Sequence, residues 1–341
     1  AKLQVIDSNG DVVEEWTSTN TPHYIEGKLI AGATYILHEE QSPNGYVIAE
    51  DVEFTVREDG TVTPVVMKDD TTKVSLSKQD LTDSSELPGA SLTVLDKNGN
   101  VIDEWISTTT PHYIEGKLIA GETYTLVEKS SPDGYLLAEA VTFTVSLDGS
   151  VDKVVMKDAR IKGFISLTKV DKDYPQNKLT GAVFEVYKDV DKDGKYNADV
   201  DVLVGTMTET EIGIYEMDLE YGYYLVYEKK APANFKHDTN YYPVFVEKDG
   251  EKYVIENEAG VGFVNEEKKG NVQIQKKTEG MLNLEGIKFI LTGKSIYGNE
   301  VRLEAVTDKN GVALFENVPI SNADGYILTE DESTIPYGYL K

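Results

Sequence analysis

The amino-acid sequence predicts an all-β protein built from tandem β-sandwich domains. Short runs of alternating apolar residues, such as FTV, SLTVL and KFILT, are separated by Asn-Gly, Asp-Gly and Pro-x-Gly turns about every ten residues, as in β-sandwiches. The segment TPHYIEGKLIAG at 21–32 returns unchanged at 110–121, and VVMKD at 65–69 returns at 154–158. Self-similarity at a fixed period indicates tandem domains.

The repeat period divides the chain into four units. Residues 1–70 align with residues 90–159 without a gap, and weaker copies follow along the chain. The pattern VSLSK at 74–78 returns as ISLTK at 165–169 and as VQIQK at 272–276. By this alignment, the first unit lacks its first strand and the fourth lacks its last strands. We therefore expect four domains in an elongated rod, called the first to fourth repeats below, at 1–70, 71–159, 160–268 and 269–341.

The composition narrows the class of protein. The chain carries 33 Lys and Arg against 60 Asp and Glu, a net charge of −27, which repels nucleic acid and anionic membranes. Such a charge suits an extracellular protein or one that meets cations. No apolar run of about 18 residues is present, so no membrane span is expected. Cysteine is absent, so disulfides and zinc–thiolate sites are excluded. A secreted protein of small β domains would then need another stabilising link in place of disulfides.

An ionisable or amide side chain ends the apolar stripe of three strands in each complete repeat. Alternation along a strand places Val74, Leu76 and Lys78 of VSLSK on one face. The same alternation places Glu128 on the apolar face of YTLVE at 124–128. It places Asp158 on the apolar face of VVMKD at 154–158. The third repeat has an asparagine where the second has an aspartate. The trios are Lys78, Glu128 and Asp158 in the second repeat and Lys169, Glu228 and Asn265 in the third.

Two interpretations of these trios compete. In the first, the side chains lie at strand ends, where they reach water or form ordinary ion pairs. In the second they are buried and react: burial lowers the pKa of an amine and raises that of a carboxyl group, so a neutral lysine can attack the Asp158 carboxyl or the Asn265 carboxamide. A nearby glutamate would move the protons, and the product is an amide between side chains. Recurrence of the trio favours the second interpretation. The exchange of Asp for Asn favours it too, since an amine can attack either group but only Asp forms a salt bridge.

The first and fourth repeats contain only parts of this pattern. Glu39 and Asp69 occupy the glutamate and aspartate positions of the first repeat, which has no lysine to match. Lys276 and Glu330 occupy the lysine and glutamate positions of the fourth repeat, which has no acceptor, and Glu332 is also in phase with the inward face. We expect incomplete half-sites here. Truncation of the two repeats explains them, and a strand donated by a neighbouring molecule is the alternative.

The order Lys, Gly-Ala, Glu, Pro-x-Gly-Tyr and Asp or Asn, with VVMKDA at 154–159, resembles the B-type repeats of Gram-positive collagen adhesins and the related SpaA-type pilin domains. The resemblance covers essentially the whole chain. It implies prealbumin-like (inverse immunoglobulin) sandwiches with an intramolecular Lys–Asn or Lys–Asp isopeptide bond and a catalytic Glu. Carried onto this sequence, it implies the bonds and their catalytic glutamates as Lys78–Asp158 with Glu128 and Lys169–Asn265 with Glu228.

From this resemblance we expect a structural stalk segment of a cell-wall-anchored Gram-positive surface adhesin or pilin-like protein, located outside the cell. Its only chemistry would be single-turnover cross-linking of itself, so it is not an enzyme, and it requires no cofactor. Other domains would contact a host matrix protein or glycan, and segments outside this chain would attach it to peptidoglycan. The alternative is a ligand-binding adhesin whose repeats themselves bind a host matrix protein or glycan.

One acidic segment of the third repeat suggests a calcium site. The stretch DVDKDGKYNADVD at 189–201 begins with the D-x-D-x-D-G pattern of an EF-hand loop, but its twelfth residue is Val200 and no helices flank it. The alternative is an acidic turn exposed to solvent, because Asp and Gly favour turns. The candidate ligands are Asp189, Asp191, Asp193, Lys195, Asn197 and Asp201.

Overall fold

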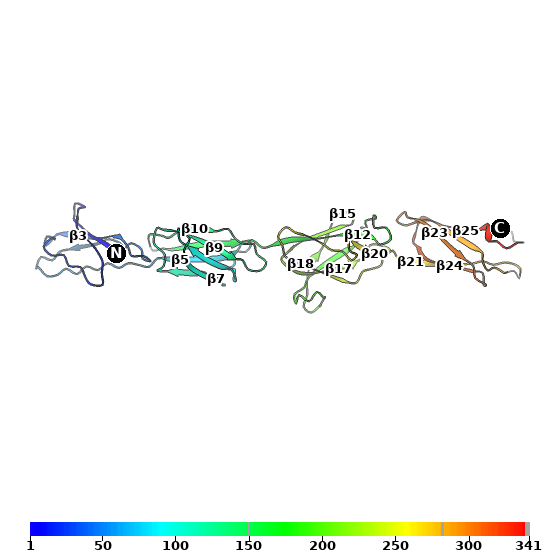
Figure 1. The fold of residues 1–341 in the computed structure, drawn as a ribbon, viewed down its shortest axis with the longest axis horizontal. Helices are drawn as coiled ribbons and strands as arrows, with labels where there is room; N and C mark the ends of the chain where they lie inside the picture. Colours follow the sequence, from blue (N-terminus) through cyan, green and yellow to red (C-terminus); the bar gives the residue numbers. More distant parts are fainter. Residues whose placement is uncertain (149, 281–282, 338–341) are drawn as a thin grey trace. The chain divides into compact units, whose positions relative to one another are not determined.

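The computed structural model describes residues 1–148, 150–280 and 283–337, and the predictions for the other positions of the fourth repeat lie outside the described residues. The described chain is built from β-strands, and its one helical element is the short 3-10 turn η1 (Glu332–Thr334). The chain divides into two compact parts, Ala1–Ile161 and Lys162–Lys341. The first part contains the first and second repeats with residues 160–161, and the other contains the rest of the third repeat and the fourth (Figure 1).

The second repeat is a sandwich of two sheets. Its strands are β5 (Lys73–Asp80), β6 (Ser91–Leu95), β7 (Val101–Ile106), β8 (His112–Glu115), β9 (Thr123–Ser130), β10 (Val141–Thr144) and β11 (Val151–Asp158). One sheet has the order β10-β9-β6-β7 and the other has the order β11-β5-β8. Leu76, Leu126 and Met156 belong to the buried core of this repeat. The first and last strands of the repeat, β5 and β11, are parallel neighbours.

Sequence-encoded turns connect these strands. Between β6 and β7, Asp96 Oδ1 accepts hydrogen bonds from the backbone N–H groups of Asn98 and Asn100, each at 2.8 Å. Gly99 in the same turn has a φ of 83°, a conformation that glycine adopts without steric cost. The Asn-Gly signal in the sequence therefore marks a hairpin, as expected.

The third repeat has the same two-sheet construction. Its strands are β12 (Lys162–Asp171), β13 (Val183–Lys188), β14 (Val202–Thr206), β15 (Thr208–Glu211), β16 (Ile214–Glu220), β17 (Gly222–Lys230), β18 (Tyr241–Val246), β19 (Lys252–Val254) and β20 (Phe263–Asn265). One sheet has the order β14-β13-β17-β18, and in the other β12 lies between β16 and β19 and also pairs with β20. Ile165, Phe184, Val226 and Phe263 lie in its core.

The first repeat has a single sheet among its described residues, with the order β2-β1-β3-β4. Its strands are β1 (Lys2–Ile6), β2 (Val12–Thr17), β3 (Thr34–Gln41) and β4 (Val52–Thr55). The prediction that VVMKD at 65–69 forms a strand is wrong, because these residues pair with no other strand. In the second repeat the matching segment, β11, pairs with β5, and no described strand of the first repeat takes the place of β5. As a result Val65 and Met67 are only partly buried, whereas their counterparts Val154 and Met156 are buried.

The fourth repeat is formed by β21 (Lys269–Gln275), β22 (Lys288–Ser295), β23 (Glu300–Val306), β24 (Val312–Pro319) and β25 (Ser321–Glu330). β21 pairs with β24, and a second sheet has the order β23-β22-β25. Ile287, Phe289 and Phe315 are buried in its core. The lysine position, Lys276, follows the last residue of β21, and the glutamate position, Glu330, ends β25.

Candidate functional site

The lysine and acceptor of the second repeat come from parallel neighbours. In the β5–β11 register, Lys78 lies opposite Met156, and Asp158 lies two residues further along β11. Because side chains two residues apart point to the same face, Met156 and Asp158 both face the interior beside Lys78. Glu128 reaches the same place from β9 in the opposite sheet, and the predicted inward positions of all three residues are observed.

The three side chains are in direct contact inside the sandwich. Lys78 Nζ lies 2.9 Å from Glu128 Oε1 and contacts Asp158 Oδ1 still more closely. The exposed fractions of the three side chains are 1% or less. Glu128 Oε2 accepts a hydrogen bond from the backbone N–H of Ala138 at 2.7 Å, which fixes the carboxylate. Burial raises the pKa of the Asp158 carboxyl above its ordinary value, against the lowering effect of Lys78. The site thus places an amine against a carboxyl group that burial drives toward its neutral form.

The third repeat repeats this geometry with a carboxamide. β12 and β20 are parallel neighbours in which Lys169 lies opposite Phe263, so Asn265 again lies two residues beyond. Lys169 Nζ lies 3.3 Å from Glu228 Oε1 and donates to the Phe263 carbonyl at 3.2 Å. Asn265 Nδ2 donates to both oxygens of Glu228, at 2.8 and 2.9 Å. Glu228 therefore bridges the amine and the carboxamide, and its second oxygen also accepts the backbone N–H of Asp238.

Burial changes the acidity of this lysine. Lys169 is fully buried, and its Nζ lies 4.8 Å from the centre of the Phe263 ring. Burial lowers the pKa of Lys169 to about 8, although the Glu228 carboxylate opposes the shift. About a tenth of the amine is then neutral at pH 7, compared with well under a thousandth for an ordinary lysine. A neutral amine is the form that can attack a carbonyl carbon.

The first repeat holds two of the three groups. Glu39 is buried, and one of its carboxylate oxygens accepts the backbone N–H of Ala49 at 2.7 Å. Its other oxygen is buried without a hydrogen-bond partner. Burial raises the pKa of Glu39, and the neighbouring Asp69 raises it further. No lysine among the described residues forms an ion pair with Glu39 or Asp69, as the sequence predicts for a half-site.

In the fourth repeat, the structure brings the lysine and a glutamate together. Lys276 Nζ lies 2.7 Å from Glu330 Oε2, with side chains 27% and 15% exposed. The choice of Glu330 over Glu332 follows from this contact, since Glu332 lies in the 3-10 turn η1. Lys276 donates to no Asp or Asn side chain within the described ranges. This pair is therefore less enclosed than the two complete trios.

A further pair of inward residues was not anticipated from the sequence. Asp80 and Asp171 lie two residues after the lysines, in phase with them, and are almost fully buried. Asp80 Oδ2 accepts hydrogen bonds from Arg160 Nε at 2.7 Å and from the Tyr135 hydroxyl at 2.8 Å. Burial acts to raise the pKa of Asp80, but the Arg160 contact holds it well below its ordinary value. Continuing the two-residue count past each lysine would have found both aspartates.

The third repeat has no arginine in the equivalent place. Glu267, two residues after Asn265, aligns with Arg160, two residues after Asp158, and is buried. Asp171 Oδ2 and Glu267 Oε1 are both buried without hydrogen-bond partners. Burial raises the pKa of each carboxyl, and Asp171 adds to the shift of Glu267.

The acidic segment 189–201 forms a loop between β13 and β14. The structure brings Asp189, Asp191 and Asp193 together, with one oxygen of each within 4.8 Å of the others. Asn197 and Asp201 have other contacts: Asn197 Oδ1 accepts the Asp199 N–H, and the two Asp201 oxygens accept backbone N–H groups within the loop. Of the six predicted ligands, three carboxylates converge, Asn197 and Asp201 hold the loop, and Lys195 donates its backbone N–H to Asp193 Oδ1 at 2.8 Å.

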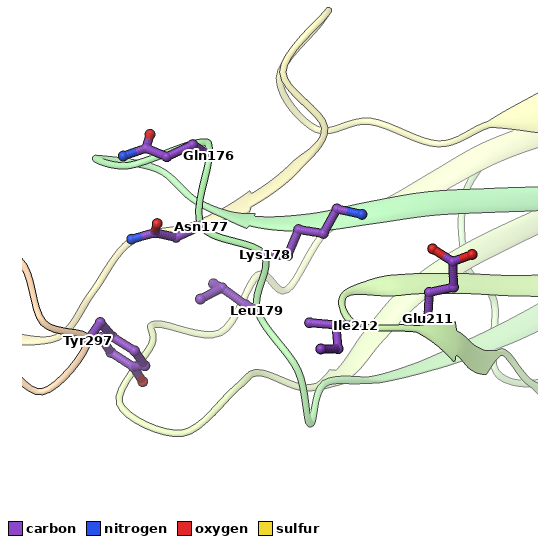
Figure 2. Close-up of a pocket in the computed structure, with 7 residues that line it drawn as sticks. All are labelled: Gln176, Asn177, Lys178, Leu179, Glu211, Ile212 and Tyr297. Atoms are coloured by element: carbon purple, nitrogen blue, oxygen red, sulfur yellow. The ribbon is translucent and has the colours of Figure 1, made fainter.

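A surface hollow lies elsewhere in the part of the chain from residue 162 onward. Figure 2 shows its lining, which comes from the segment 176–179, the turn at Glu211 and Ile212, and Tyr297. Its charged members, Lys178 and Glu211, are both exposed. Tyr297 is the ionisable member that is not fully exposed: burial raises the pKa of its hydroxyl, which donates to the Ala233 carbonyl.

One family model matches most of the chain. The model of the SpaA prealbumin-like fold domain matches residues 1–71, 72–160 and 163–259. The third matched segment ends before β20 and Asn265. No curated protein sequence matches the chain. No helix in the described part of the chain has the length and hydrophobicity that a membrane span requires.

Solved structures with related folds have low sequence identity. The Bacillus anthracis TIE protein matches with a TM-score of 0.61 at 18% identity, covering 96% of this chain and 60% of that protein. BcpA, the major pilin subunit of Bacillus cereus, matches at 15% identity with a TM-score of 0.35, covering 77% and 91%. The shaft pilin SpaA from Lactobacillus rhamnosus GG matches at 13% identity with a TM-score of 0.23, covering 58% and 98%. The first of these shows a shared fold, and this chain spans 60% of that protein's length.

Proposed function

The chain belongs to the family of SpaA prealbumin-like fold domains, and from this premise we propose that it is a stalk segment of a cell-wall-anchored Gram-positive surface adhesin or pilin-like protein. The family match confirms the predicted resemblance and the predicted class of tandem prealbumin-like β domains. In this proposal the chain acts outside the cell and bears mechanical load. Its domains are stabilised by covalent bonds that they form within themselves.

The bond proposed for the second repeat joins Lys78 Nζ to the side-chain carbonyl carbon of Asp158. The neutral amine attacks the protonated carboxyl group, one C–O bond breaks, and one water molecule leaves. Glu128 takes a proton from the amine and delivers it to the departing oxygen, which its contact with Lys78 supports. The reaction removes two charges from a site that water does not reach, so the product is favoured there over the ion pair.

The bond proposed for the third repeat joins Lys169 Nζ to the side-chain carbonyl carbon of Asn265. Ammonia leaves in place of water. Glu228 already contacts the amine and the Asn265 amide nitrogen, so one carboxylate can accept the lysine proton and protonate the leaving nitrogen. The low pKa of Lys169 supplies the neutral nucleophile. No metal or cofactor is required by this chemistry.

The load-bearing role follows from where the bonds lie. In the second repeat, the proposed bond connects β5 to β11, the first and last strands. Tension entering at the start of β5 passes through the Lys78–Asp158 amide and leaves after β11. The intervening residues 79–157 then carry no force, so the hydrogen bonds of the sandwich are not loaded. The full burial of the Lys78, Glu128 and Asp158 side chains in mutual contact is the observation that carries this proposal.

Intact mass spectrometry of the denatured chain tests the cross-links. Two bonds lower the mass by about 35 Da, one water and one ammonia. Glu128→Ala is expected to restore about 18 Da and Glu228→Ala about 17 Da, with the double variant at the formula mass. A wild-type mass equal to the formula mass would show that the trios are ion pairs, and the load-bearing role would lose its basis.

A further inference from the structure

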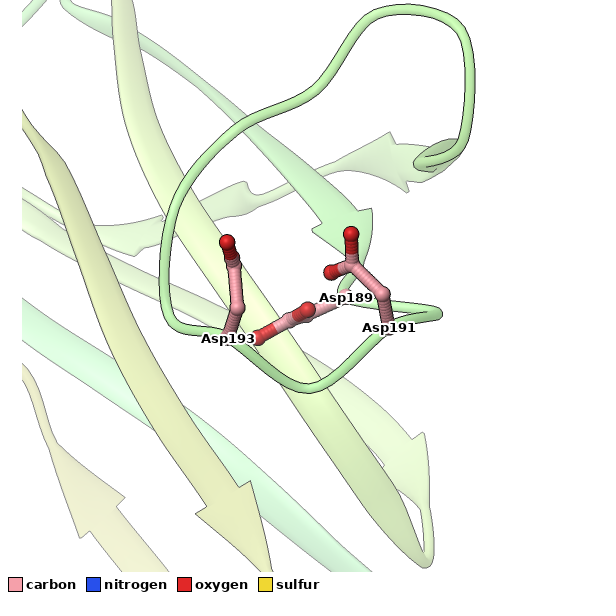
Figure 3. Close-up of side chains that lie close together, drawn as sticks. All are labelled: Asp189, Asp191 and Asp193. Carbon is pink, nitrogen blue, oxygen red and sulfur yellow. The ribbon is translucent and has the colours of Figure 1, made fainter.

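The acidic loop of the third repeat gathers its first three carboxylates at one point. The loop fills residues 189–201, between the paired strands β13 and β14. Figure 3 shows Asp189, Asp191 and Asp193 near the start of the loop, and one oxygen of each lies within 4.8 Å of the other two. Three carboxylates at this separation repel one another unless a cation lies between them.

One of these carboxylates is buried with an unused oxygen. Asp189 is only 3% exposed. Its Oδ2 accepts the backbone N–H of Gly194 at 2.9 Å, whereas its Oδ1 is buried without a hydrogen-bond partner. A buried, unpaired carboxylate oxygen is costly unless another ligand satisfies it.

No side chain of the described residues supplies the missing positive charge. No lysine or arginine in these ranges forms an ion pair with Asp189, Asp191 or Asp193. Lys192, within the loop, has its amine 5.3 Å from the centre of the Tyr223 ring instead. A bound cation would supply the positive charge that these three carboxylates lack.

Other contacts hold the loop in this shape. Asp201 Oδ1 accepts the Val190 N–H and its Oδ2 accepts the Asn197 N–H, at 3.1 and 2.7 Å, so Asp201 ties both halves of the loop together. Tyr196 stacks on Tyr241 of β18 with ring centres 4.5 Å apart, which fastens the loop to the sheet. Asp189 Oδ2 and Asp193 Oδ1 also accept backbone N–H groups of the loop, from Gly194 and Lys195, so the contacts of Asp201 and Tyr196 add to these in preorganising the loop for a ligand.

We propose that Asp189, Asp191 and Asp193 bind a calcium ion, and that Asp201 and Tyr196 position the loop that carries them. Calcium prefers six to eight oxygen ligands in flexible geometry, so water and the carbonyl of Lys195, at the seventh place of the loop, would supply the remaining ligands. With three carboxylates and no closing bidentate glutamate, the dissociation constant falls in the range of extracellular modules, about 10⁻⁴–10⁻³ M. Bound calcium holds the loop closed and protects residues 189–201 from proteases.

Terbium luminescence tests the site, because Tb³⁺ replaces Ca²⁺ at oxygen sites and tyrosines such as Tyr196 sensitise its emission. The full chain is expected to give saturable luminescence on excitation of tyrosine, and Ca²⁺ should reverse it at concentrations at least about tenfold lower than Mg²⁺. Asp189→Asn and Asp191→Asn should each weaken Ca²⁺ binding at least about tenfold. Asp199→Asn removes an exposed carboxylate of the same loop and serves as the matched control. Limited proteolysis with and without Ca²⁺ provides the second readout, with slower cleavage in 189–201 when Ca²⁺ is present.

Several outcomes would overturn the proposal. Luminescence that survives unchanged in Asp189→Asn would assign Tb³⁺ to the general acidic surface of the chain. Equal displacement by Ca²⁺ and Mg²⁺ would remove the calcium assignment. An absence of saturable luminescence, together with cleavage in the loop that ignores Ca²⁺, would show that the carboxylates form an acidic turn without a ligand.

Discussion

Lys78 Nζ lies 2.9 Å from Glu128 Oε1 in the interior of the second repeat, where neither side chain exposes more than 1% of its surface. Asp158 contacts the same amine, so one cation is shared by two carboxyl groups away from water. A buried carboxylate without a cation of its own is expensive, and proton uptake or amide formation relieves the cost. This explains why an apolar strand ends in an inward carboxyl group at the position where a lysine can reach it.

Replacing Glu128 by Gln should prevent the Lys78–Asp158 bond, because the amide cannot take the lysine proton. If the bond forms in the wild type, closing a loop of 80 residues stabilises the second repeat by about 4–5 kcal/mol, by analogy with a disulfide. Chemical denaturation of the variant should show a loss of about that size. Glu139→Gln is the control and should leave stability unchanged. Glu139 is exposed and follows Ala138, whose backbone N–H donates to Glu128. Equal stability of Glu128→Gln and wild type, with both at the unlinked mass, would argue against the bond.

Lys169 should make the stability of an unlinked third repeat depend on pH. In Asn265→Ala the amine has no acceptor and stays free. Its folded pKa of about 8 lies below the ordinary 10.5, so between these values the unfolded chain binds more protons than the folded one. Stability therefore rises as pH increases from about 8 to 10.5, by up to about 3 kcal/mol, and the penalty is fully present below pH 8.

Denaturation of Asn265→Ala at pH 8 and pH 10 measures this slope, and the wild type supplies the comparison, since an amide nitrogen does not titrate there. Lys169→Met in the Asn265→Ala background should remove the excess slope and leave the contribution of other groups. An unchanged slope in that double variant would show that Lys169 is not the titrating group.

The first repeat should be the part of the chain that proteases cleave most readily. Among the described residues no lysine pairs with its Glu39 or Asp69, and its counterparts of the second repeat's core, such as Val65 and Met67, are only partly buried. Local opening costs little where few apolar contacts oppose it. Limited proteolysis followed by mass spectrometry should give early cuts within 56–70 and late cuts within 79–157. Glu39→Ala should leave the mass deficit of the intact chain unchanged, and a gain of mass in that variant would reveal a cross-link in the first repeat.

Sequence periodicity was sufficient to predict both complete trios, because a two-residue count fixes the face of each strand independently of the rest of the fold. Periodicity did not predict residues 65–69 correctly, because the pentapeptide that forms part of β11 forms no strand there. Strand formation there depends on a partner strand: β11 pairs with β5 in the second repeat, and no described strand of the first repeat takes the place of β5. The ion pair of Asp80 with Arg160 was also missed, since Arg160 lies beyond the end of β11, where alternation no longer applies.

Exchanging one residue at the end of the third repeat should reverse its response to pH. Asp171 and Glu267 are buried carboxyl groups whose pKa values are raised above the ordinary 3.8 and 4.5, with Asp173 and Lys269 as their charged neighbours. Such groups contribute stability that is fully present below the ordinary pKa values and is lost as pH rises through the raised ones.

Glu267→Arg places a guanidinium at the position of the third repeat that is equivalent to Arg160, which pairs with Asp80 in the second repeat. The pKa of Asp171 should then fall below its ordinary value. The variant should then be more stable than wild type by about 1–3 kcal/mol at pH 7 and lose that gain as pH falls below about 4. Thermal unfolding of the wild type and of Glu267→Arg at pH 4 and pH 7 measures how the stability of each depends on pH. Glu258→Arg changes an exposed residue by the same charge and is the control. If Glu267→Arg and Glu258→Arg behave alike, net charge accounts for the effect and the buried carboxyl pair does not.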